Sequence, residues 1–260
     1  PCLVLLVPEP MTSPARAPLP RAALVVVTAL GLVWAATACT GGGDEPARDD
    51  PAETTVPEPA TPVLTPDRAD PLPVVTPAPA AMRWVGPDIA VPASVTVDHA
   101  EDADPAALDV VAEILRAAGA TVEVRVVAGD DDATAASDDD LVVRVGPLDD
   151  PGVAAEIAAV TAAPTPEATP EGYALAAYTL SDGSARVVLA GADPAGTFYA
   201  AQTLRQLAGA GTIAGVAVAD RPAMAHRGAI EGFYGSPWTT EERPDLLAFA
   251  GRFKLNTYVY

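Results

Sequence analysis

The chain has 260 residues, of which 35 are acidic and 15 are basic, so its formal net charge is −20. This balance argues against a nucleic-acid partner, because phosphate binding needs a surplus of Lys and Arg on some face. Half of the residues are hydrophobic, 5% are aromatic and 28 are proline, which together predict an Ala/Val-rich core joined to a proline-rich tether. The two cysteines, Cys2 and Cys39, precede residue 40, so neither a disulfide framework nor a thiolate metal site is expected after them.

Residues 1–40 have the layout of a bacterial secretory signal. The first methionine is Met11, and a basic region separates it from an uncharged apolar run over residues 22–38. Small residues directly before Cys39 resemble a lipobox, with alanine at the position where leucine is usual, and so predict that Cys39 is acylated. The alternatives are a plain signal peptide or a short membrane anchor. We expect an exported protein, held at the cell surface as a lipoprotein or secreted, with Pro1 to Pro10 as an upstream extension.

Residues 41–83 are acidic and rich in Pro, Ala and Thr, without a helical or alternating apolar period. Pieces such as Pro57-Glu58-Pro59 indicate an extended, polyproline-type spacer. Its expected role is to hold a folded domain away from the cell surface.

A small α+β domain is predicted for residues 84–222. Three Asp-Pro pairs begin helices, at Asp104, Asp150 and Asp193, because Asp is a favoured N-cap and Pro fits the first helical turn. Apolar residues at helical spacing follow each pair. Strands are expected over 94–98, 121–127, 141–145, 173–180, 186–190 and 215–219.

Two details of this domain are specific. Segment 121–127 alternates valine with polar residues, which predicts a half-buried strand. The run Ser181-Asp182-Gly183-Ser184 lies between two apolar segments, and Asp-Gly at such a position predicts a β-hairpin. We therefore expect a sheet covered by helices.

Metal-binding candidates are weak throughout. The aspartate runs 130–132 and 138–140 lack the glycine and glutamate spacing of a calcium loop, so they are interpreted as a solvated acidic loop. His99 and His226 have no second His or Cys at ligand spacing, so both are interpreted as structural. No metal and no organic cofactor is expected.

A family resemblance begins in the second half of the predicted domain. The stretch 171–207, from Glu171-Gly172-Tyr173 to Leu207, resembles the small N-terminal domain that precedes the catalytic barrel in several bacterial hexosaminidases. That domain occurs in more than one family and does not hold the catalytic groups. The resemblance therefore leaves the reaction open at this point.

The run Glu231-Gly232-Phe233-Tyr234-Gly235-Ser236-Pro237-Trp238 resembles the opening of the catalytic (β/α)8 barrel of glycoside hydrolase family 84, the β-N-acetylglucosaminidases that include the O-GlcNAcases. Family 20 hexosaminidases share the preceding domain but open their barrel differently. The resemblance implies that residues 223–260 form the first β-α-β elements of a truncated (β/α)8 (TIM) barrel, since a whole barrel needs about 250 residues.

The residues themselves fit such a unit. A strand is expected over 228–233, and Thr239 and Glu242 have the spacing of a capping box at the start of a helix. Asn256 is expected to end that helix, and residues 257–260 to begin a second strand. The buried side of the helix is assigned to four apolar residues, Leu246, Leu247, Phe249 and Phe253.

The resemblance also implies substrate-binding roles for Gly232 and Tyr234, which follow the first barrel strand. A glycine lets a backbone carbonyl approach a sugar, and a tyrosine offers an apolar ring with a hydroxyl; alternatively, both residues only shape the turn. The family's catalytic pair is two adjacent aspartates, expected beyond Tyr260, so no catalytic residue is assigned to this chain. Glu231 is interpreted as a hydrogen-bonding residue of the barrel interior, and Lys254 as a cation that suits a helix C-terminus.

The resemblance implies that the parent protein is a glycoside hydrolase, a β-N-acetylglucosaminidase that removes terminal β-linked GlcNAc from a glycan or glycoprotein. Its mechanism would be substrate-assisted, through an oxazoline formed by the 2-acetamido group, with retention and without a cofactor. The alternatives are a non-catalytic glycan-binding module of the cell surface and a family 20-type β-hexosaminidase. Membrane contact is expected only through the N-terminal lipid or signal anchor.

Overall fold

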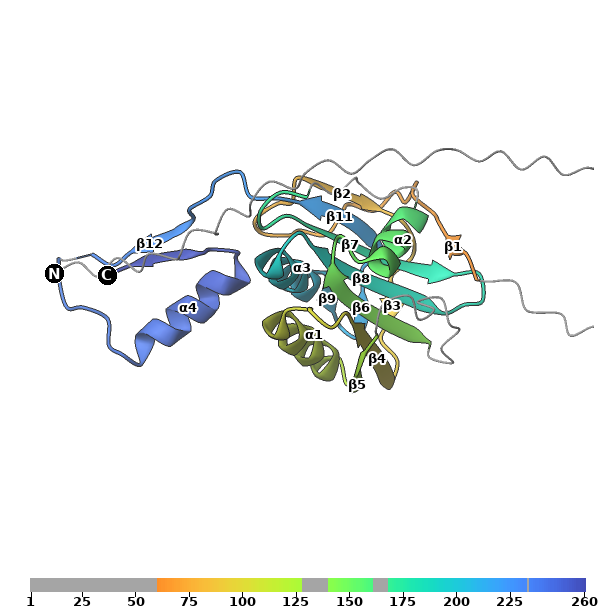
Figure 1. Ribbon diagram of the computed structural model, residues 1–260, viewed down its shortest axis with the longest axis horizontal. Coiled ribbons are helices and arrows are strands. Elements are labelled where there is room, and N and C mark those ends of the chain that lie inside the picture. Colours follow the sequence, from red (N-terminus) through yellow and green to blue (C-terminus); the bar gives the residue numbers. More distant parts are fainter. Residues whose placement is uncertain (1–59, 128–139, 161–167, 233) are drawn as a thin grey trace, which may run out of the picture. The chain divides into compact units, whose positions relative to one another are not determined.

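The computed structural model describes residues 60–127, 140–160, 168–232 and 234–260 (Figure 1), all within the compact unit Glu58–Tyr260. Several predicted features lie outside these residues: the signal region 1–40 with Cys39, the first part of the spacer, and the acidic residues 130–132, 138 and 139. No helix in the described part is long and apolar enough to cross a membrane.

A mixed eight-stranded sheet forms the centre of the α+β domain, in the order β2-β11-β7-β8-β6-β4-β5, with β1 paired to β7. Strands β5, β4, β6 and β8 run parallel, and β7, β11 and β2 continue the sheet in antiparallel pairs. The strands are β1 (Pro62–Val63), β2 (Ala81–Trp84), β4 (Ser94–His99), β5 (Thr121–Val126), β6 (Leu141–Pro147), β7 (Tyr173–Leu180), β8 (Ala185–Gly191) and β11 (Val216–Asp220). Three short strands make a second sheet: β3 (Ile89–Ala90), β9 (Ala208–Gly209) and β10 (Thr212–Ile213).

The predicted hairpin and helix starts are confirmed. Strands β7 and β8 are joined at Gly183, whose φ of +92° is left-handed, a conformation that glycine adopts readily. Helices α1 (Pro105–Ala117), α2 (Pro151–Ala159) and α3 (Pro194–Leu207) each begin after an N-cap aspartate. The carboxylates of Asp104, Asp150 and Asp193 accept the amide hydrogens of Ala107, Val153 and Gly196 at 2.9, 2.9 and 2.8 Å.

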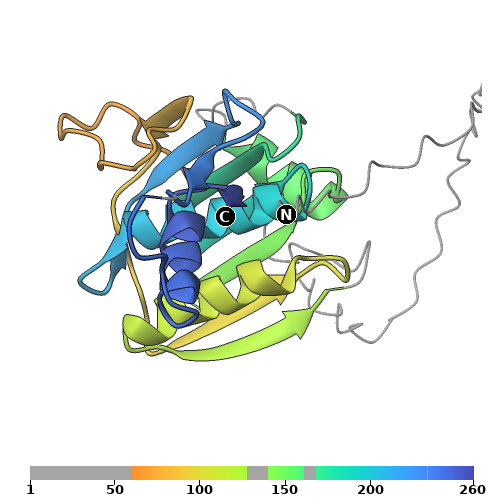
Figure 2. The ribbon, with the colours of Figure 1, turned by 90° about the vertical axis from the view of Figure 1, so that its left-hand side faces the viewer.

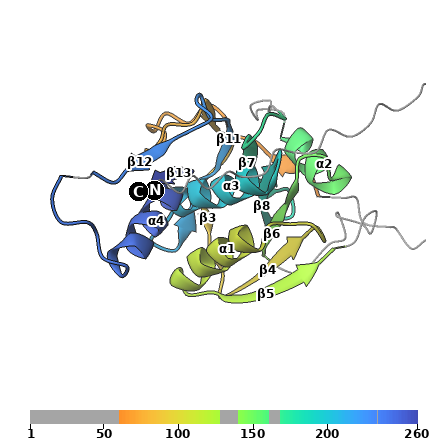
Figure 3. The ribbon, with the colours of Figure 1, turned by 60° about the vertical axis from the view of Figure 1, so that its left-hand side comes forward.

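Helices cover both faces of this sheet, which is why its central strands are buried throughout (Figure 2 and Figure 3). Side chains alternate between the two faces with the period of two that strands impose. On β8, Val187 and Leu189 join the core beneath α1 and α3, whereas Val188 and Ala190 join the core beneath α2. The result is a three-layered domain with a core on each side of the sheet.

Strand β5 is more exposed than its alternating pattern predicted. Strand β5 contains three valines. Val124 and Val126 are 45% and 60% exposed, and Val122 is the one that packs against the core. The reason is position: β5 is the last strand of the sheet, with β4 as its one strand neighbour. Alternation indicates a strand with two different faces, but a central or edge position decides how deeply one face is buried.

The second half of the predicted spacer is part of the folded domain. Strand β1 pairs with β7, and β2 pairs with β11, so the sheet includes residues before the predicted boundary at Trp84. Val75 is 5% exposed within the core, and the side chain of Gln206 hydrogen-bonds both the amide and the carbonyl of Thr76. Proline-rich composition hid these contacts because the strands concerned are short and are held by partners more than 100 residues away.

Residues 228–259 form the predicted strand–helix–strand unit: β12 (Gly228–Ile230), α4 (Glu242–Arg252) and β13 (Thr257–Val259), with β12 and β13 parallel. The two hydrogen bonds of the predicted capping box form: the Thr239 amide donates to Glu242 Oε2 at 2.8 Å and the Glu242 amide to Thr239 Oγ1 at 3.2 Å. The helix itself begins later than predicted, at Glu242, with Glu241 as the N-cap residue. Helix α4 ends at Arg252, four residues before the predicted end at Asn256. The Asn256 side chain does not end the helix but accepts a hydrogen bond from the Arg227 amide.

The apolar side of α4, which a complete barrel would bury, is exposed in the described structure, as expected for a chain that contains only the start of a barrel. No residue of this helix is buried, and Leu247 and Phe249 are 49% and 54% exposed. A two-stranded sheet offers too little surface to cover an amphipathic helix, whereas a complete barrel supplies a continuous one.

Candidate active site

A pocket of about 320 Å³ lies where β12 and β13 end, at the carboxyl edge of the parallel pair. This is the edge at which barrel enzymes carry their active sites. The volume is at the lower end of the range of ligand pockets, about 300–1,000 Å³. The lining residues are Glu231, Gly232, Gly235, Pro237, Arg243 and Tyr260.

Glu231 is the hub of this pocket. Its carboxylate accepts two hydrogen bonds from Arg243, each 3.1 Å, one from the Trp238 amide at 2.9 Å, and one from the Tyr258 hydroxyl. The Arg243 guanidinium, followed by the Tyr258 hydroxyl, lowers the Glu231 pKa to about 2. Glu231 is therefore a fixed anion at neutral pH and is unsuited to donate a proton there.

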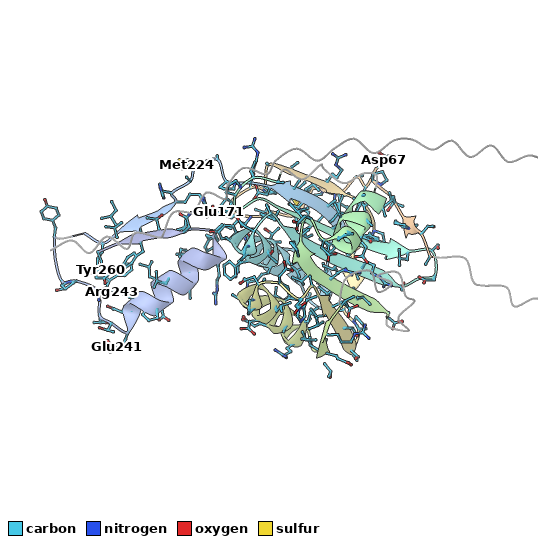
Figure 4. The ribbon with its side chains drawn as sticks, in the orientation of Figure 1. Asp67, Glu171, Met224, Glu241, Arg243 and Tyr260 are labelled. Carbon is cyan, nitrogen blue, oxygen red and sulfur yellow. The ribbon has the colours of Figure 1, made fainter. Side chains whose placement is uncertain are left out.

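Arg243 and the two tyrosines of the second strand and its end, Tyr258 and Tyr260, were not identified from the sequence as residues at the pocket. Arg243 projects from α4 and lies near Tyr260, with its guanidinium 5.4 Å from the ring centroid (Figure 4). Tyr258 and Tyr260 lie on the same side of the second strand and its end, with their rings stacked at 5.9 Å. The alternation of the two tyrosines was a usable signal, whereas the pairing of Arg243 with Glu231 joins residues 12 apart across a loop.

The structure separates the two residues predicted to bind substrate. Gly232 lines the pocket, and a Cβ atom at this position would meet no heavy atom within 4 Å, so the backbone there is open to a ligand. Tyr234 has a fully exposed side chain, at 102%, and is not among the lining residues. Phe233 lies outside the described residues.

Lys254 is in a different environment from the one predicted. It is 5% exposed, and its ammonium donates to the Tyr173 hydroxyl at 2.6 Å and to Asp220 Oδ2 at 3.1 Å. Burial lowers the Lys254 pKa, an effect that Asp220 opposes. Lys254 does follow the C-terminus of α4, as predicted, but its side chain is buried against Tyr173 and Asp220 of the α+β domain.

A second hollow, of about 560 Å³, lies on the α+β domain around Arg68, Gly86 and Asp88. The Arg68 guanidinium in this hollow already has partners: it pairs with Asp70 at 2.6 Å and Asp88 at 2.7 Å, and it lies over the Trp84 ring. This hollow therefore offers little unpaired chemistry to a ligand.

Metal ligands do not converge in the described ranges, where no group of three or more His, Cys, Asp or Glu side chains could hold an ion. His99 Nδ1 lies 2.8 Å from the Ala100 carbonyl oxygen, and His226 is exposed. Neither histidine is part of the pocket.

Known families match the two regions separately. Residues 72–221 match the model of glycosyl hydrolase family 20, domain 2, and residues 227–260 match that of beta-N-acetylglucosaminidase. Protein O-GlcNAcase of Rattus norvegicus is 42% identical over 52 residues, which are 20% of this chain and 6% of that protein.

Two solved structures share the fold. CpGH84B is 24% identical with a TM-score of 0.55, covering 71% of this chain and 29% of its own. CpGH84D is 20% identical with a TM-score of 0.59, covering 72% of this chain and 30% of its own. The chain thus spans less than a third of the length of these relatives. Because the match over 72–221 covers more than half of the chain, the chain belongs to the family described as glycosyl hydrolase family 20, domain 2.

Proposed function

We propose that the protein acts as a β-N-acetylglucosaminidase of the family 84 type, removing terminal β-linked GlcNAc from a glycan or glycoprotein. The observation that carries this proposal is that the pocket and the matched residues lie in the same part of the chain. The residues that match the beta-N-acetylglucosaminidase model, 227–260, form the β12–α4–β13 unit whose carboxyl edge holds the pocket. The 42% identity to Protein O-GlcNAcase over 52 residues supports family 84 over family 20.

The proposed reaction is substrate-assisted. The oxygen of the 2-acetamido group attacks the anomeric carbon, the bond to the leaving oxygen breaks as that oxygen is protonated, and water then opens the oxazoline with retention. Glu231 is a poor candidate for the acid because its pKa is about 2. We assign the acid/base and the group that orients the acetamide to two aspartates beyond Tyr260, and no cofactor takes part.

The residues described here would shape the pocket rather than carry out the proton transfers. Gly232 is proposed to let the backbone approach a sugar hydroxyl, which its open surroundings permit. Tyr234 is proposed to close over the sugar with its ring and hydroxyl, a movement that its complete exposure allows. Glu231 is proposed to hold Arg243 and Tyr258 in place around the pocket.

Hydrolysis of an aryl β-N-acetylglucosaminide tests the proposal. A longer natural product that continues past Tyr260 should turn over this substrate, whereas residues 1–260 alone should not, because positioning of the acid and the acetamide is a large share of the acceleration. Binding of GlcNAc-terminated glycans without turnover by the longer product would reject the enzyme and favour a glycan-binding module. Turnover by residues 1–260 alone would show that the catalytic groups are misassigned.

Export is the second part of the proposal, resting on the apolar run 22–38 and on Cys39 behind its small residues. We propose that the mature protein begins at an acylated Cys39. Mass spectrometry of the N-terminus of the membrane fraction is expected to find a lipid-modified cysteine. An unmodified N-terminus downstream of Cys39 would contradict the lipoprotein assignment and leave simple secretion.

A further inference from the structure

Two ion pairs join the β12–α4–β13 unit to the α+β domain. Arg227 pairs with Glu171 at 2.7 Å, with side chains 14% and 19% exposed. Lys254 pairs with Asp220 at 3.1 Å, with side chains only 7% and 12% exposed. Figure 4 marks Glu171 on the α+β side of this joint. Arg227 directly precedes β12 and Lys254 lies between α4 and β13, whereas both carboxylates belong to the α+β domain, so the contact is complementary in charge.

The Lys254 ammonium enters a nearly closed polar cluster. The Tyr173 hydroxyl accepts from Lys254 at 2.6 Å and also lies within hydrogen-bond distance of Asp220 Oδ2, at 2.9 Å, and of Thr203 Oγ1, at 2.7 Å. Tyr173 is 1% exposed and Thr203 is fully buried. Because this cluster is shielded from water, each charged partner depends on the other for compensation.

The backbone of Lys254 indicates that the cluster holds it in place. Its φ of +60° is in the left-handed region, which a residue with a long side chain seldom adopts. Such conformations persist where surrounding contacts determine them. Here the Lys254 amide donates to the Gly251 carbonyl at 3.1 Å, and its own carbonyl accepts from Arg227 Nε at 3.0 Å.

The same joint holds the amino ends of both strands. The Arg227 carbonyl accepts the amides of Asn256 at 2.7 Å and Thr257 at 2.9 Å, and the Arg227 amide donates to the Asn256 side chain at 2.9 Å. These bonds set the register in which Gly228 pairs with Thr257. Tyr258 follows directly, and its hydroxyl reaches Glu231 at the other end of the pair.

We propose that Lys254 is a positioning residue. Its buried pair with Asp220 fixes the start of β13 against the α+β domain, and this register delivers Tyr258 and Tyr260 to the pocket around Glu231. The α+β domain, which contributes no lining residue to that pocket, thereby controls its geometry. The structural claim is independent of the enzymatic activity; only its effect on turnover rests on the proposed function.

Hydrogen exchange followed by mass spectrometry on the 260-residue chain tests this role. Lys254→Met leaves the Asp220 carboxylate buried without its cation, so the amides of Glu231, Asn256 and Thr257 should exchange faster, on the order of a hundredfold. Amides of β7 and β8 should keep their protection. The double variant Lys254→Met/Asp220→Asn removes the uncompensated charge, because an asparagine can still accept from the Ala80 amide and donate to Tyr173. It does not restore the tie to β13, so the amides of Asn256 and Thr257 should still exchange fast.

Glu113→Gln is the matched control. It removes one carboxylate from the Arg205–Glu113 pair at 2.8 Å, in which Glu113 is 62% exposed, so exchange in β12 and β13 should stay unchanged. Unaltered exchange in Lys254→Met, or acceleration shared equally by β7 and β8, would overturn the proposal. Full recovery of protection in the double variant would also overturn it, because the pair would then not be what holds β13.

In a longer product with the proposed activity, kcat of the same variants tests whether the Lys254–Asp220 pair affects the geometry of the pocket. Lys254→Met should lower kcat for the aryl glycoside about tenfold or more, and the double variant should stay low because it also lacks the pair. An unchanged kcat together with faster exchange would overturn the link to the pocket. Absence of activity in the unaltered protein would reject the proposed function while the exchange experiment still decides the joint.

Discussion

The α+β domain and the β12–α4–β13 unit are stabilised in different ways. In the domain, helices cover both faces of the sheet, and strands such as β8 are buried at every position. In the β12–α4–β13 unit, α4 has no buried residue and Ile230 of β12 is 72% exposed. The unit is held instead by its capping box, by the Glu231 cluster and by ion pairs to the domain. The domain therefore carries most of the stability of the described region, and the unit carries the residues that line the pocket.

The largest effect is expected in the core of the domain. Leu189→Ala removes a fully buried side chain from β8 and should lower the free energy of unfolding by about 2–5 kcal/mol. Leu247→Ala, at a position 49% exposed on α4, is the matched control and should change it by less than about 0.5 kcal/mol. Urea unfolding followed by circular dichroism measures both. Equal losses would show that α4 belongs to the same core.

Removing helix caps should have smaller effects on the free energy of unfolding, and these should also differ between the α+β domain and the β12–α4–β13 unit. Asp193→Ala removes an acceptor for the amides of Gly196 and Glu171, both 2.8 Å away, and should cost about 1–2 kcal/mol in the same urea measurement. Thr239→Ala breaks the capping box of α4 but should leave the cooperative transition within about 0.5 kcal/mol, since no buried residue depends on this helix. A loss of the same size for both would contradict the division into two regions.

Acid should loosen the β12–α4–β13 unit before the domain. The Glu231 pKa is about 2 in the folded chain, against an ordinary value of 4.5, so the folded state gains stability from this carboxylate above pH 4.5. That contribution is lost as the pH falls from 4.5 towards 2. A carboxyl titration followed by NMR should give a midpoint near 2.

Arg243→Gln is the variant that checks the cause. Removing the guanidinium should move the Glu231 midpoint up towards 4.5, because Arg243 is the largest contributor to the shift. A wild-type midpoint already close to 4.5 would show that the Glu231–Arg243 contact is not maintained in solution.

The smallest effect on stability is expected at Tyr234, whose side chain is fully exposed. Tyr234→Phe and Tyr234→Ala should both leave the urea midpoint unchanged. In a longer product that has the proposed activity, Tyr234→Phe should lower kcat/KM only several-fold, as expected for one neutral hydrogen bond of about 0.5–1.5 kcal/mol. Tyr234→Ala should lower it further because the ring is also lost. An unchanged kcat/KM in Tyr234→Ala would remove this residue from the sugar pocket.

Local interactions could be predicted from the sequence because both partners are close in the chain. Asp104 caps an amide three residues ahead, Thr239 and Glu242 bond each other, and Gly183 lies within a turn of four residues. Apolar periodicity likewise located the three helices and the six longest strands of the domain, but not its short strands β1, β2, β3, β9 and β10. Each of these features depends on bonds that a short segment makes with itself.

Contacts between distant segments could not be predicted in the same way. Trp84 and Val75 belong to the core because β2 pairs with β11 and because residues near 75 contact the end of α3. Val124 and Val126 are exposed because β5 lies at the sheet edge. Periodicity indicates which residues share a face, but the order of strands decides which faces are covered.

The sequence by itself determined the Asp-Pro helix starts, the turn at Gly183 and the strand–helix–strand order of residues 228–259. Only the tertiary structure decided the partners of Glu231 and the burial of Lys254, which lies 34 residues from Asp220 and 81 from Tyr173. The physical reason is that a charged side chain is buried at acceptable cost only when an oppositely charged partner lies within hydrogen-bond distance. That distance is set by strand register and domain packing, which no short stretch of sequence encodes alone.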